Sequence, residues 1–182
     1  GVYFTVVEGG EQHLLQTRLI GDYNVANLLG VIGAMRALGV PLADAVRACG
    51  HLQPVPGRME QIASPGQPLV AVDYAHTPDA LDKTLQALRP LAQARAGQLW
   101  CVFGCGGERD ATKRPLMAAV AEKWADHVVV TSDNPRSEKP EAIISQILLG
   151  LSRNQCVQVE ADRARAISST LTQAAANDVV LI

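Results

Sequence analysis

The sequence predicts an α/β fold in which a doubly wound, mainly parallel sheet follows a smaller N-terminal segment. From residue 69 onward, short apolar runs alternate with helical patterns, which is typical of βαβ units in a parallel sheet. Three of the expected helices have a proline where the first helical residue should lie, at Pro78, Pro115 and Pro140. A stretch rich in proline and glycine, residues 51–68, separates the two parts and predicts a linker that contains the domain boundary.

The N-terminal segment predicts a hairpin followed by two helices. Two alternating runs on either side of a glycine turn indicate a hairpin over residues 1–20. Apolar residues at helical spacing predict a helix over Asn24–Leu38, and a second helix follows Pro41 and stops near Gly50. The chain lacks an initial Met and ends within an apolar run, so we expect a fragment of a longer protein.

The second part predicts five short apolar strands in alternation with four helices. The expected strands are Leu69–Tyr74, Gln98–Phe103, His127–Thr131, Val157–Glu160 and Val179–Ile182. Helices begin at the three prolines, and a fourth carries Ala164, Ile167 and Leu171. Strands of this kind are usually buried between helices on both faces of a parallel sheet.

Composition and charge exclude several classes of partner. A hydrophobic share of 48% and a charged share of 19% are ordinary for a soluble globular protein. A net charge of −2 leaves no basic surplus for a nucleic-acid backbone. No apolar run approaches the roughly 20 residues that cross a bilayer, and no secretory leader is present, so we expect a cytoplasmic protein without a membrane partner.

The cysteines do not predict a metal site. Cys49, Cys101, Cys105 and Cys156 form no CxxC pair and have no His or second Cys at ligand spacing. We interpret them as small core or loop residues of a reduced protein, and we predict no metal ligands in this chain.

Polar clusters follow three of the predicted strands directly. These clusters are Asp73–Asp79, Gly104–Asp110 and Ser132–Arg136. In an open parallel sheet, ligands bind beyond the carboxyl ends of the strands. We therefore expect the three clusters to line one rim of the sheet.

The glycine-rich cluster matches no standard nucleotide motif. A GxGxxG pattern from Gly104 would need glycine at position 109, which is Arg109, and no GxxxxGK[ST] run occurs. The glycines still permit a tight turn with exposed amides, and Arg109, Lys113 and Arg114 lead into a helix N-terminus, which favours a carboxylate or a phosphate. An ordinary strand–helix turn with surface charges fits the spacing equally well.

The run Asp133-Asn134-Pro135-Arg136 predicts a stiff loop, because Pro135 fixes its own φ and restricts Asn134. Arg136 can fork onto a carboxylate while Asp133 or Asn134 accepts from an ammonium, so the loop can bind a zwitterion. For the tetrapeptide alone, the more common alternative is an Asx-turn with a solvated Arg136.

Asp73, His76 and Arg58 also have ordinary alternatives. Asp73 can cap the turn that follows it, although Thr77 is the better helix cap. His76 can be a hydrogen-bonded loop residue, and Arg58 can meet a phosphate or pair with Glu60. No Ser-His-Asp or Cys-His order is present. The residues alone therefore indicate an anion- and zwitterion-binding rim on a Rossmann-like domain.

Five runs of the sequence, in this order, closely resemble the Mur ligase family, and within it the diaminopimelate-adding ligases. They are GDYNVANLLGVIGA, GRME, VDYAHTPDALDKTL, WCVFGCGGERDATKRPLMAAVAEKWAD and VVVTSDNPRSEKPEAI. The resemblance covers nearly the whole chain.

The resemblance implies a division of the chain and a reaction. Residues 1–57 resemble the incomplete tail of the family's central ATP-binding domain, and residues 58–182 resemble a truncated, Rossmann-like, amino-acid-binding C-terminal domain. The implied substrates are UDP-N-acetylmuramoyl-L-Ala-D-Glu, meso-diaminopimelate and ATP, with Mg²⁺ as cofactor and a monomeric enzyme. In the family, ATP phosphorylates the peptide carboxylate, and the incoming amine attacks the acyl phosphate, while Mg²⁺ offsets the accumulating charge.

Residue roles follow by position from the resemblance. It implies that Asn24 and Asn27 lie near the adenine and ribose of the nucleotide, and that Arg58, Asp73 and His76 reach ATP from across the cleft.

The resemblance also implies which residues bind the amino acid. Asp133, Asn134, Pro135 and Arg136 match the motif that distinguishes diaminopimelate-adding from lysine-adding ligases, and Arg109 matches a second arginine contact to the amino acid. Because diaminopimelate has a distal carboxylate that lysine lacks, an arginine-bearing carboxylate site can make this choice.

The chain departs from the family by omission. The phosphate-binding loop, a carbamylated lysine and the magnesium ligands belong upstream of Gly1, and a glycine-rich segment belongs after Ile182. We therefore expect the catalytic residues to lie outside this chain, which is expected to be inactive alone. The rivals are a folylpolyglutamate or cyanophycin synthetase, against which the Asp133–Arg136 run counts, and a non-catalytic nucleotide-binding module, against which the Asn24 and Arg58 motifs count.

Overall fold

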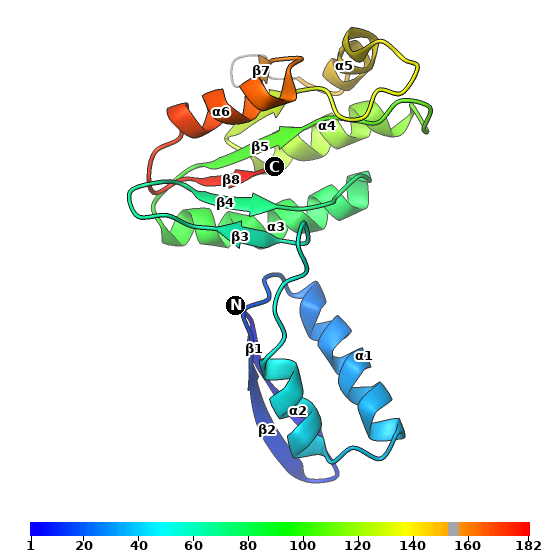
Figure 1. Cartoon of the computed structure of the whole chain (residues 1–182), viewed down its shortest axis with the longest axis vertical. Helices are drawn as coiled ribbons and strands as arrows, with labels where there is room; N and C mark the ends of the chain where they lie inside the picture. Colours follow the sequence, from blue (N-terminus) through cyan, green and yellow to red (C-terminus); the bar gives the residue numbers. More distant parts are fainter. Residues whose placement is uncertain (153–156) are drawn as a thin grey trace. The chain divides into compact units, whose positions relative to one another are not determined.

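The computed structural model describes residues 1–152 and 157–182, so Cys156 lies outside the described residues. The chain forms two compact units, Gly1–Met59 and Glu60–Ile182 (Figure 1). The division falls inside the stretch rich in proline and glycine, where breakers prevent a continuous element. None of the described helices is both long and apolar enough to cross a bilayer.

The first unit is a hairpin packed on two helices, as predicted. The elements are β1 (Tyr3–Glu8), β2 (Glu11–Gln16), α1 (Tyr23–Ala37) and α2 (Leu42–Gly50). Gly9 and Gly10 both have positive φ, 56° and 90°, as a two-residue hairpin turn requires. One face of the hairpin and the inner faces of both helices bury a small apolar core that includes Val6, Leu15 and Leu28.

The second unit is built on one six-stranded sheet, which confirms the doubly wound, mainly parallel fold. Its strands lie in the order β3 (Glu60–Ile62), β4 (Leu69–Val72), β8 (Val179–Leu181), β5 (Leu99–Phe103), β6 (His127–Val130) and β7 (Val157–Val159). Neighbouring strands from β4 to β7 are parallel, and β3 pairs with β4 in the antiparallel sense. The short strand β3 lies inside the stretch predicted as a linker, residues 51–68, where no strand was expected; its pairing with β4 defines it.

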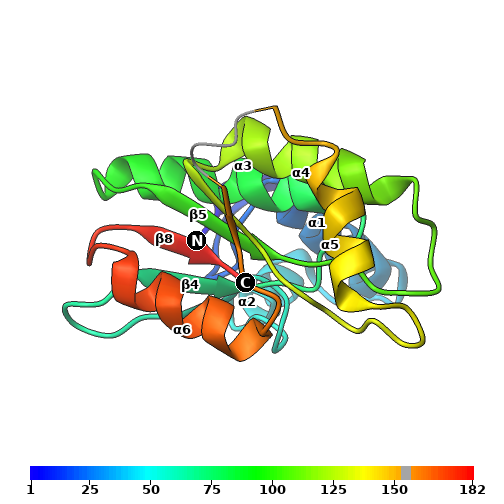
Figure 2. The ribbon, with the colours of Figure 1, turned by 90° about the horizontal axis from the view of Figure 1, so that it is seen from above.

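Helices cover both faces of this sheet. The helices α3 (Pro78–Ala94), α4 (Lys113–Trp124) and α5 (Pro140–Leu148) follow β4, β5 and β6, and α6 (Arg163–Gln173) follows β7. Figure 2 shows α3 and α4 on one side of the sheet and α6 on the other. Thr77 caps α3 as predicted, because its Oγ1 accepts from the Ala80 N–H at 3.2 Å.

One predicted helix start was wrong. Pro78 and Pro140 are the first residues of α3 and α5, but α4 begins at Lys113, two residues before Pro115. Proline is tolerated throughout a first helical turn, because the N–H groups there have no intrahelical acceptor. Pro115 therefore marks the first turn of α4 rather than its first residue.

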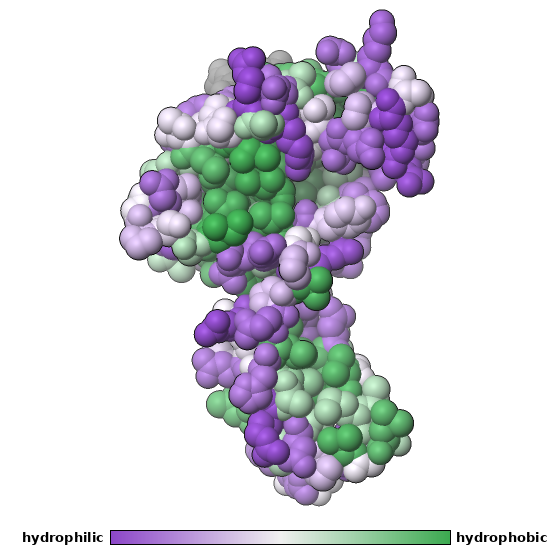
Figure 3. All heavy atoms as spheres, viewed as in Figure 1, coloured by the Kyte–Doolittle hydropathy of each residue, from purple (hydrophilic) through white to green (hydrophobic). Residues whose placement is uncertain are grey.

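The strand β8 lies in the middle of the sheet although it is the last described element of the chain. It pairs with β4 on one side and with β5 on the other, and all three of its residues are buried. On one face of the sheet, Trp100, Val102 and Val180 pack against α6. Figure 3 shows an apolar area on this unit over β4, β8 and β5.

Asp178 fixes the start of β8. Its side chain is 4% exposed and accepts three hydrogen bonds, from the Gln98 N–H at 2.8 Å, the Trp100 Nε1–H at 3.0 Å and the Ala175 N–H at 2.9 Å. One carboxylate therefore joins the start of β5 to the turn between α6 and β8.

We expect Asp178→Ala to lower the free energy of unfolding of the second unit by about 2 kcal/mol, because buried donors lose their acceptor. Unfolding can be followed by the fluorescence of Trp100 and Trp124, both of which lie in this unit. Asp162→Ala is the control, since this exposed N-cap of α6 accepts one bond, from the Arg165 N–H at 3.1 Å. Equal losses in the two variants would contradict the role given to Asp178.

Candidate functional site

The predicted polar clusters meet at one rim of the second unit. The carboxyl ends of β4, β5 and β6 lie at the same edge of the sheet, and a cleft of about 680 Å³ opens there. Its lining includes His76, Arg109, Lys113, Asp133, Asn134 and Arg136. A second cavity of about 150 Å³ at the same edge includes Asp73 and Arg163 in its lining.

Arg109 and Asp133 present charges of opposite sign to the larger cleft. Both side chains belong to exposed residues. Within the described parts of the chain, neither the Arg109 guanidinium nor the Asp133 carboxylate makes a hydrogen bond or an ion pair. A guanidinium and a carboxylate in one cleft can bind the carboxylate and the ammonium of a zwitterion.

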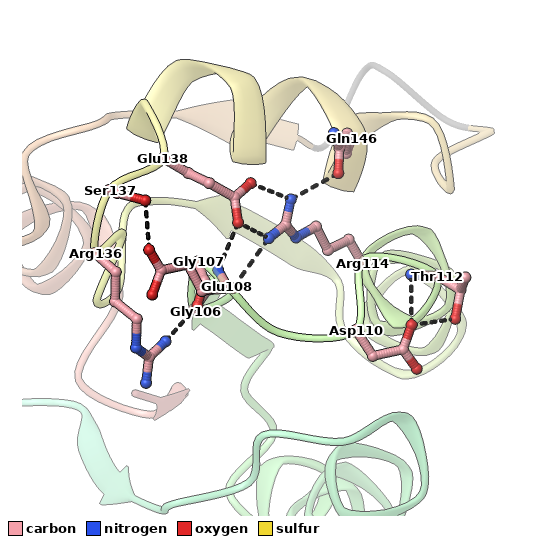
Figure 4. Close-up of polar contacts among 10 residues, drawn as sticks. All are labelled: Gly106, Gly107, Glu108, Asp110, Thr112, Arg114, Arg136, Ser137, Glu138 and Gln146. Atoms are coloured by element: carbon pink, nitrogen blue, oxygen red, sulfur yellow. Dashed lines mark hydrogen bonds and ion pairs between the residues drawn. The ribbon is translucent and has the colours of Figure 1, made fainter.

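Arg136 lies in a left-handed backbone conformation, with φ 50°. This conformation is unfavourable for a residue with a Cβ and is usually held by its surroundings. Its Nη1 donates to the Gly107 carbonyl, so Arg136 reaches the neighbouring loop rather than being only solvated (Figure 4). The side chains of Asp133 and Asn134 close no Asx-turn within the described residues, so the structure does not support the alternative of an Asx-turn with a solvated Arg136.

Besides Pro135, the close approach of two loops restrains this run, and two glycines are required for that approach. A Cβ on Gly107 would lie 1.9 Å from the Pro135 carbonyl oxygen, and one on Gly104 would lie 2.5 Å from the Thr131 carbonyl oxygen. The Gly107 N–H donates to the Asn134 carbonyl at 2.9 Å. The sequence interpretation gave these glycines exposed amides for a ligand, and this was wrong for Gly107, whose N–H is used within the protein.

Arg114 is buried, although the sequence interpretation grouped it with the cations that attract a ligand. It is 1% exposed and donates to both carboxylate oxygens of Glu138, each at 2.9 Å. It also donates to Gln146 Oε1 at 2.7 Å and to the Gly106 carbonyl at 3.2 Å. The grouping was wrong, and Glu138 was missed because the pair joins two segments that no local periodicity connects.

Glu138 accepts hydrogen bonds from α4 and from the loop that follows β5. Besides Arg114, the Glu108 N–H donates to it at 2.6 Å. The Arg114 guanidinium, and secondly this N–H, lower the pKa of the Glu138 carboxyl to about 2. Because the folded pKa lies below the ordinary value of 4.5, the stabilisation is complete above that value and is lost as the pH falls toward 2.

The residues that follow β4 are held by local hydrogen bonds. Asp73 Oδ1 accepts from the Ala75 N–H at 3.0 Å and from Thr84 Oγ1 at 3.2 Å, so Asp73 caps the turn after β4. His76 lies 3.0 Å from the Tyr74 carbonyl through Nδ1, and the Lys113 Nζ donates to the His76 carbonyl at 3.0 Å. The Lys113 contact joins the first polar cluster to the start of α4.

Asn24, Asn27 and Arg58 lie in the first unit, and the other predicted site residues lie in the second. The Asn24 Nδ2 donates to the Ile20 carbonyl at 2.7 Å, and the Asn27 Nδ2 donates to Asn24 Oδ1 at 3.2 Å. Arg58 is an exposed residue. The two asparagines therefore form a connected pair at the start of α1.

The described residues do not form a magnesium or triphosphate site by themselves. Over residues 1–152 and 157–182, no three His, Cys, Asp or Glu side chains gather as metal ligands. The sequence also lacks a phosphate-binding GxxxxGK[ST] loop.

Comparison with known proteins identifies the family. A family model described as Mur ligase, glutamate ligase domain, matches residues 57–182. The whole chain aligns with a UDP-N-acetylmuramoyl-L-alanyl-D-glutamate–2,6-diaminopimelate ligase from Acidovorax sp. strain JS42 at 65% identity. The aligned region is 36% of that relative's length. The chain therefore spans about a third of that relative.

Solved structures agree with this family. A structure of a UDP-N-acetylmuramoyl-L-alanyl-D-glutamate–2,6-diaminopimelate ligase matches 99% of this chain and 36% of its own, with a TM-score of 0.65 and 39% identity. A bifunctional folylpolyglutamate/dihydrofolate synthase from Yersinia pestis, complexed with AMPPNP and a Mn ion, matches 95% of this chain and 38% of its own, with a TM-score of 0.69 and 24% identity. At that identity, the second match shows a shared fold alone. Since the family model covers well over half of the chain, the chain belongs to the Mur ligase family.

Proposed function

We propose that this chain is the amino-acid-binding part of an ATP-dependent ligase that adds meso-diaminopimelate to UDP-N-acetylmuramoyl-L-Ala-D-Glu in peptidoglycan precursor synthesis. The observation that carries the proposal is the single cleft of about 680 Å³ that Arg109, Arg136 and Asp133 line together. Two guanidiniums and one carboxylate complement the distal carboxylate and ammonium of diaminopimelate. The 65% identity to a relative of this name supports the same substrate.

In the proposed arrangement, different side chains bind the carboxylate and ammonium groups of the amino acid. Arg136 and Arg109 bind carboxylate groups, and Asp133 or Asn134 accepts from an ammonium. Pro135 keeps the loop stiff, so the guanidinium of Arg136 is held near its binding position before the substrate arrives. Binding one end of the amino acid in this way orients its other amine as the nucleophile.

ATP binding is proposed to be shared between this chain and the rest of the enzyme. Residues 1–57 form the tail of the central ATP-binding domain, and residues 58–182 belong to the C-terminal amino-acid-binding domain. Asn24, Asn27, Arg58, Asp73 and His76 contact the nucleotide, while the phosphate-binding loop and the Mg²⁺ ligands lie outside this chain.

The proposal is tested with the full-length gene product, ATP, Mg²⁺ and the UDP-muramoyl dipeptide. We expect phosphate release with meso-diaminopimelate and little with L-lysine, because lysine leaves the arginine site unpaired. The 182-residue chain alone is expected to release no ADP. Preference for lysine would overturn the proposed substrate, and release that requires a folate and glutamate instead would indicate a folylpolyglutamate synthetase.

A further inference from the structure

We infer that Arg114 and Glu138 form a positioning pair that sets the separation of Arg109 and Arg136, and so makes the ligase selective for an amino acid with a distal carboxylate. This inference rests on the function proposed above. Neither member of the pair lines the cleft of about 680 Å³, so both act through the residues that do.

The two loops that carry the arginines are joined through this pair. Arg114, in the first turn of α4, donates a hydrogen bond to the Gly106 carbonyl at 3.2 Å. Gly106 belongs to the loop that bears Arg109. Glu138, two residues after Arg136, accepts a hydrogen bond from the Glu108 N–H at 2.6 Å. Glu108 belongs to the loop that bears Arg109. Figure 4 shows the pair between the two loops. The pair therefore contacts the backbone on both sides of Gly107, because Arg114 binds Gly106 and Glu138 binds Glu108.

Further contacts make the connection rigid. Gln146 of α5 accepts from Arg114 at 2.7 Å, which ties the pair to a second helix. The Ser137 hydroxyl donates to the Glu108 carboxylate across the same gap. A two-pronged guanidinium–carboxylate pair fixes distance and orientation together, which a single hydrogen bond does not.

The chain contains a second two-pronged ion pair, with a more exposed arginine, at the opposite edge of the sheet. Arg89 also donates two hydrogen bonds to one carboxylate, that of Asp126, at 2.5 and 2.8 Å. Asp126 precedes β6 and accepts from the Leu99 N–H at 2.8 Å, so this pair lies at the amino ends of the strands. Arg89→Met therefore removes an ion pair of the same two-pronged geometry away from the rim.

The test compares Arg114→Met, Arg114→Lys, Glu138→Gln and Arg89→Met in the full-length ligase. We expect Arg114→Met and Glu138→Gln to raise KM for meso-diaminopimelate by about 10–100-fold, the effect of misplacing a binding group by about 1 Å, with KM for ATP unchanged. Arg114→Lys keeps the positive charge but loses the two-pronged geometry of the guanidinium. Its KM for meso-diaminopimelate should lie between those of the wild type and Arg114→Met. Arg89→Met should lower the midpoint of thermal unfolding and leave KM for meso-diaminopimelate unchanged.

A double-mutant cycle separates positioning from a purely structural role. If Glu138 acts by placing Arg136, Glu138→Gln should change KM for meso-diaminopimelate much less in an Arg136→Ala background than in the wild type. Additive effects would overturn the inference. So would an unchanged KM in Arg114→Met and Glu138→Gln with a lowered thermal midpoint, because the pair would then resemble Arg89–Asp126.

Hydrogen exchange distinguishes failure of this inference from failure of the proposed function. In Glu138→Gln, the Gly107 and Glu108 amides should exchange faster, while those of β5 stay protected. Unchanged exchange at both amides would overturn the inference. A wild-type enzyme that does not use meso-diaminopimelate would overturn the proposed function and the selective role, and exchange would still decide whether the pair holds the loops.

Discussion

Arg136→Ala in the full-length ligase is expected to lower kcat/KM for meso-diaminopimelate by about 30–700-fold. A charge-assisted hydrogen bond that is removed from a bound carboxylate costs about 2–4 kcal/mol, and each 1.4 kcal/mol is a factor of ten. Alanine keeps the Cβ, so the backbone strain at φ 50° is the same in both proteins. The loss can therefore be assigned to the guanidinium.

The measurement is phosphate release as a function of the amino-acid concentration. Arg165→Ala is the control, because this exposed arginine of α6 pairs with Glu160 at 3.3 Å and does not line the cleft. Any residual turnover with L-lysine should fall less than turnover with meso-diaminopimelate, since lysine has no distal carboxylate for Arg136. Equal losses with both amino acids would contradict the proposed contact.

Gly107→Ala is expected to reduce kcat/KM for meso-diaminopimelate by about 10²-fold or more. The new Cβ would lie 1.9 Å from the Pro135 carbonyl oxygen, which is backbone and cannot move by changing a rotamer. The loop that carries Arg136 must then move away by an ångström or more, and a displacement of this size costs about 10²-fold in rate. Overpacking of this kind also costs about 1–3 kcal/mol of stability.

Gly106→Ala is the matched control for this second prediction. A Cβ on Gly106 would meet the Arg136 Nη1 at 3.1 Å, and the end of a flexible side chain can shift by a few tenths of an ångström. We expect its effect on kcat/KM to be at least tenfold smaller than that of Gly107→Ala. Similar losses in the two variants would show that bulk in the turn, rather than the approach to Pro135, is responsible.

Much of the fold could be predicted because its signals are local. The neighbouring residues Thr77 and Pro78 mark the start of α3, as its N-cap and its first helical residue. The apolar runs mark the strands. The start of α4 was misjudged, because a proline fits any position of a first turn. The strand β3 carries no signal of its own, since its backbone pairing with β4 defines it.

The site was predictable to the level of the rim and no further. The rule that ligands bind at the carboxyl ends of parallel strands placed Arg109 and Asp133 at one edge, and both line the same cleft. The functions of Gly107 and Arg114 depend on Pro135 and Glu138, which lie in another loop. A single sequence carries no record of such pairings, so these residues could only be classed by type, as turn glycine and surface cation.

The central place of β8 determines the order in which this unit can be completed on the ribosome. Val179 pairs with Leu69 and Leu99, so the sheet cannot close until a segment made about 110 residues after β4 has left the exit tunnel. Until then, the apolar edges of β4 and β5 lack their partner and are open to mispairing with each other or with another nascent chain. The growing polypeptide therefore passes through a stage at which two apolar strand edges wait, unpaired, for β8.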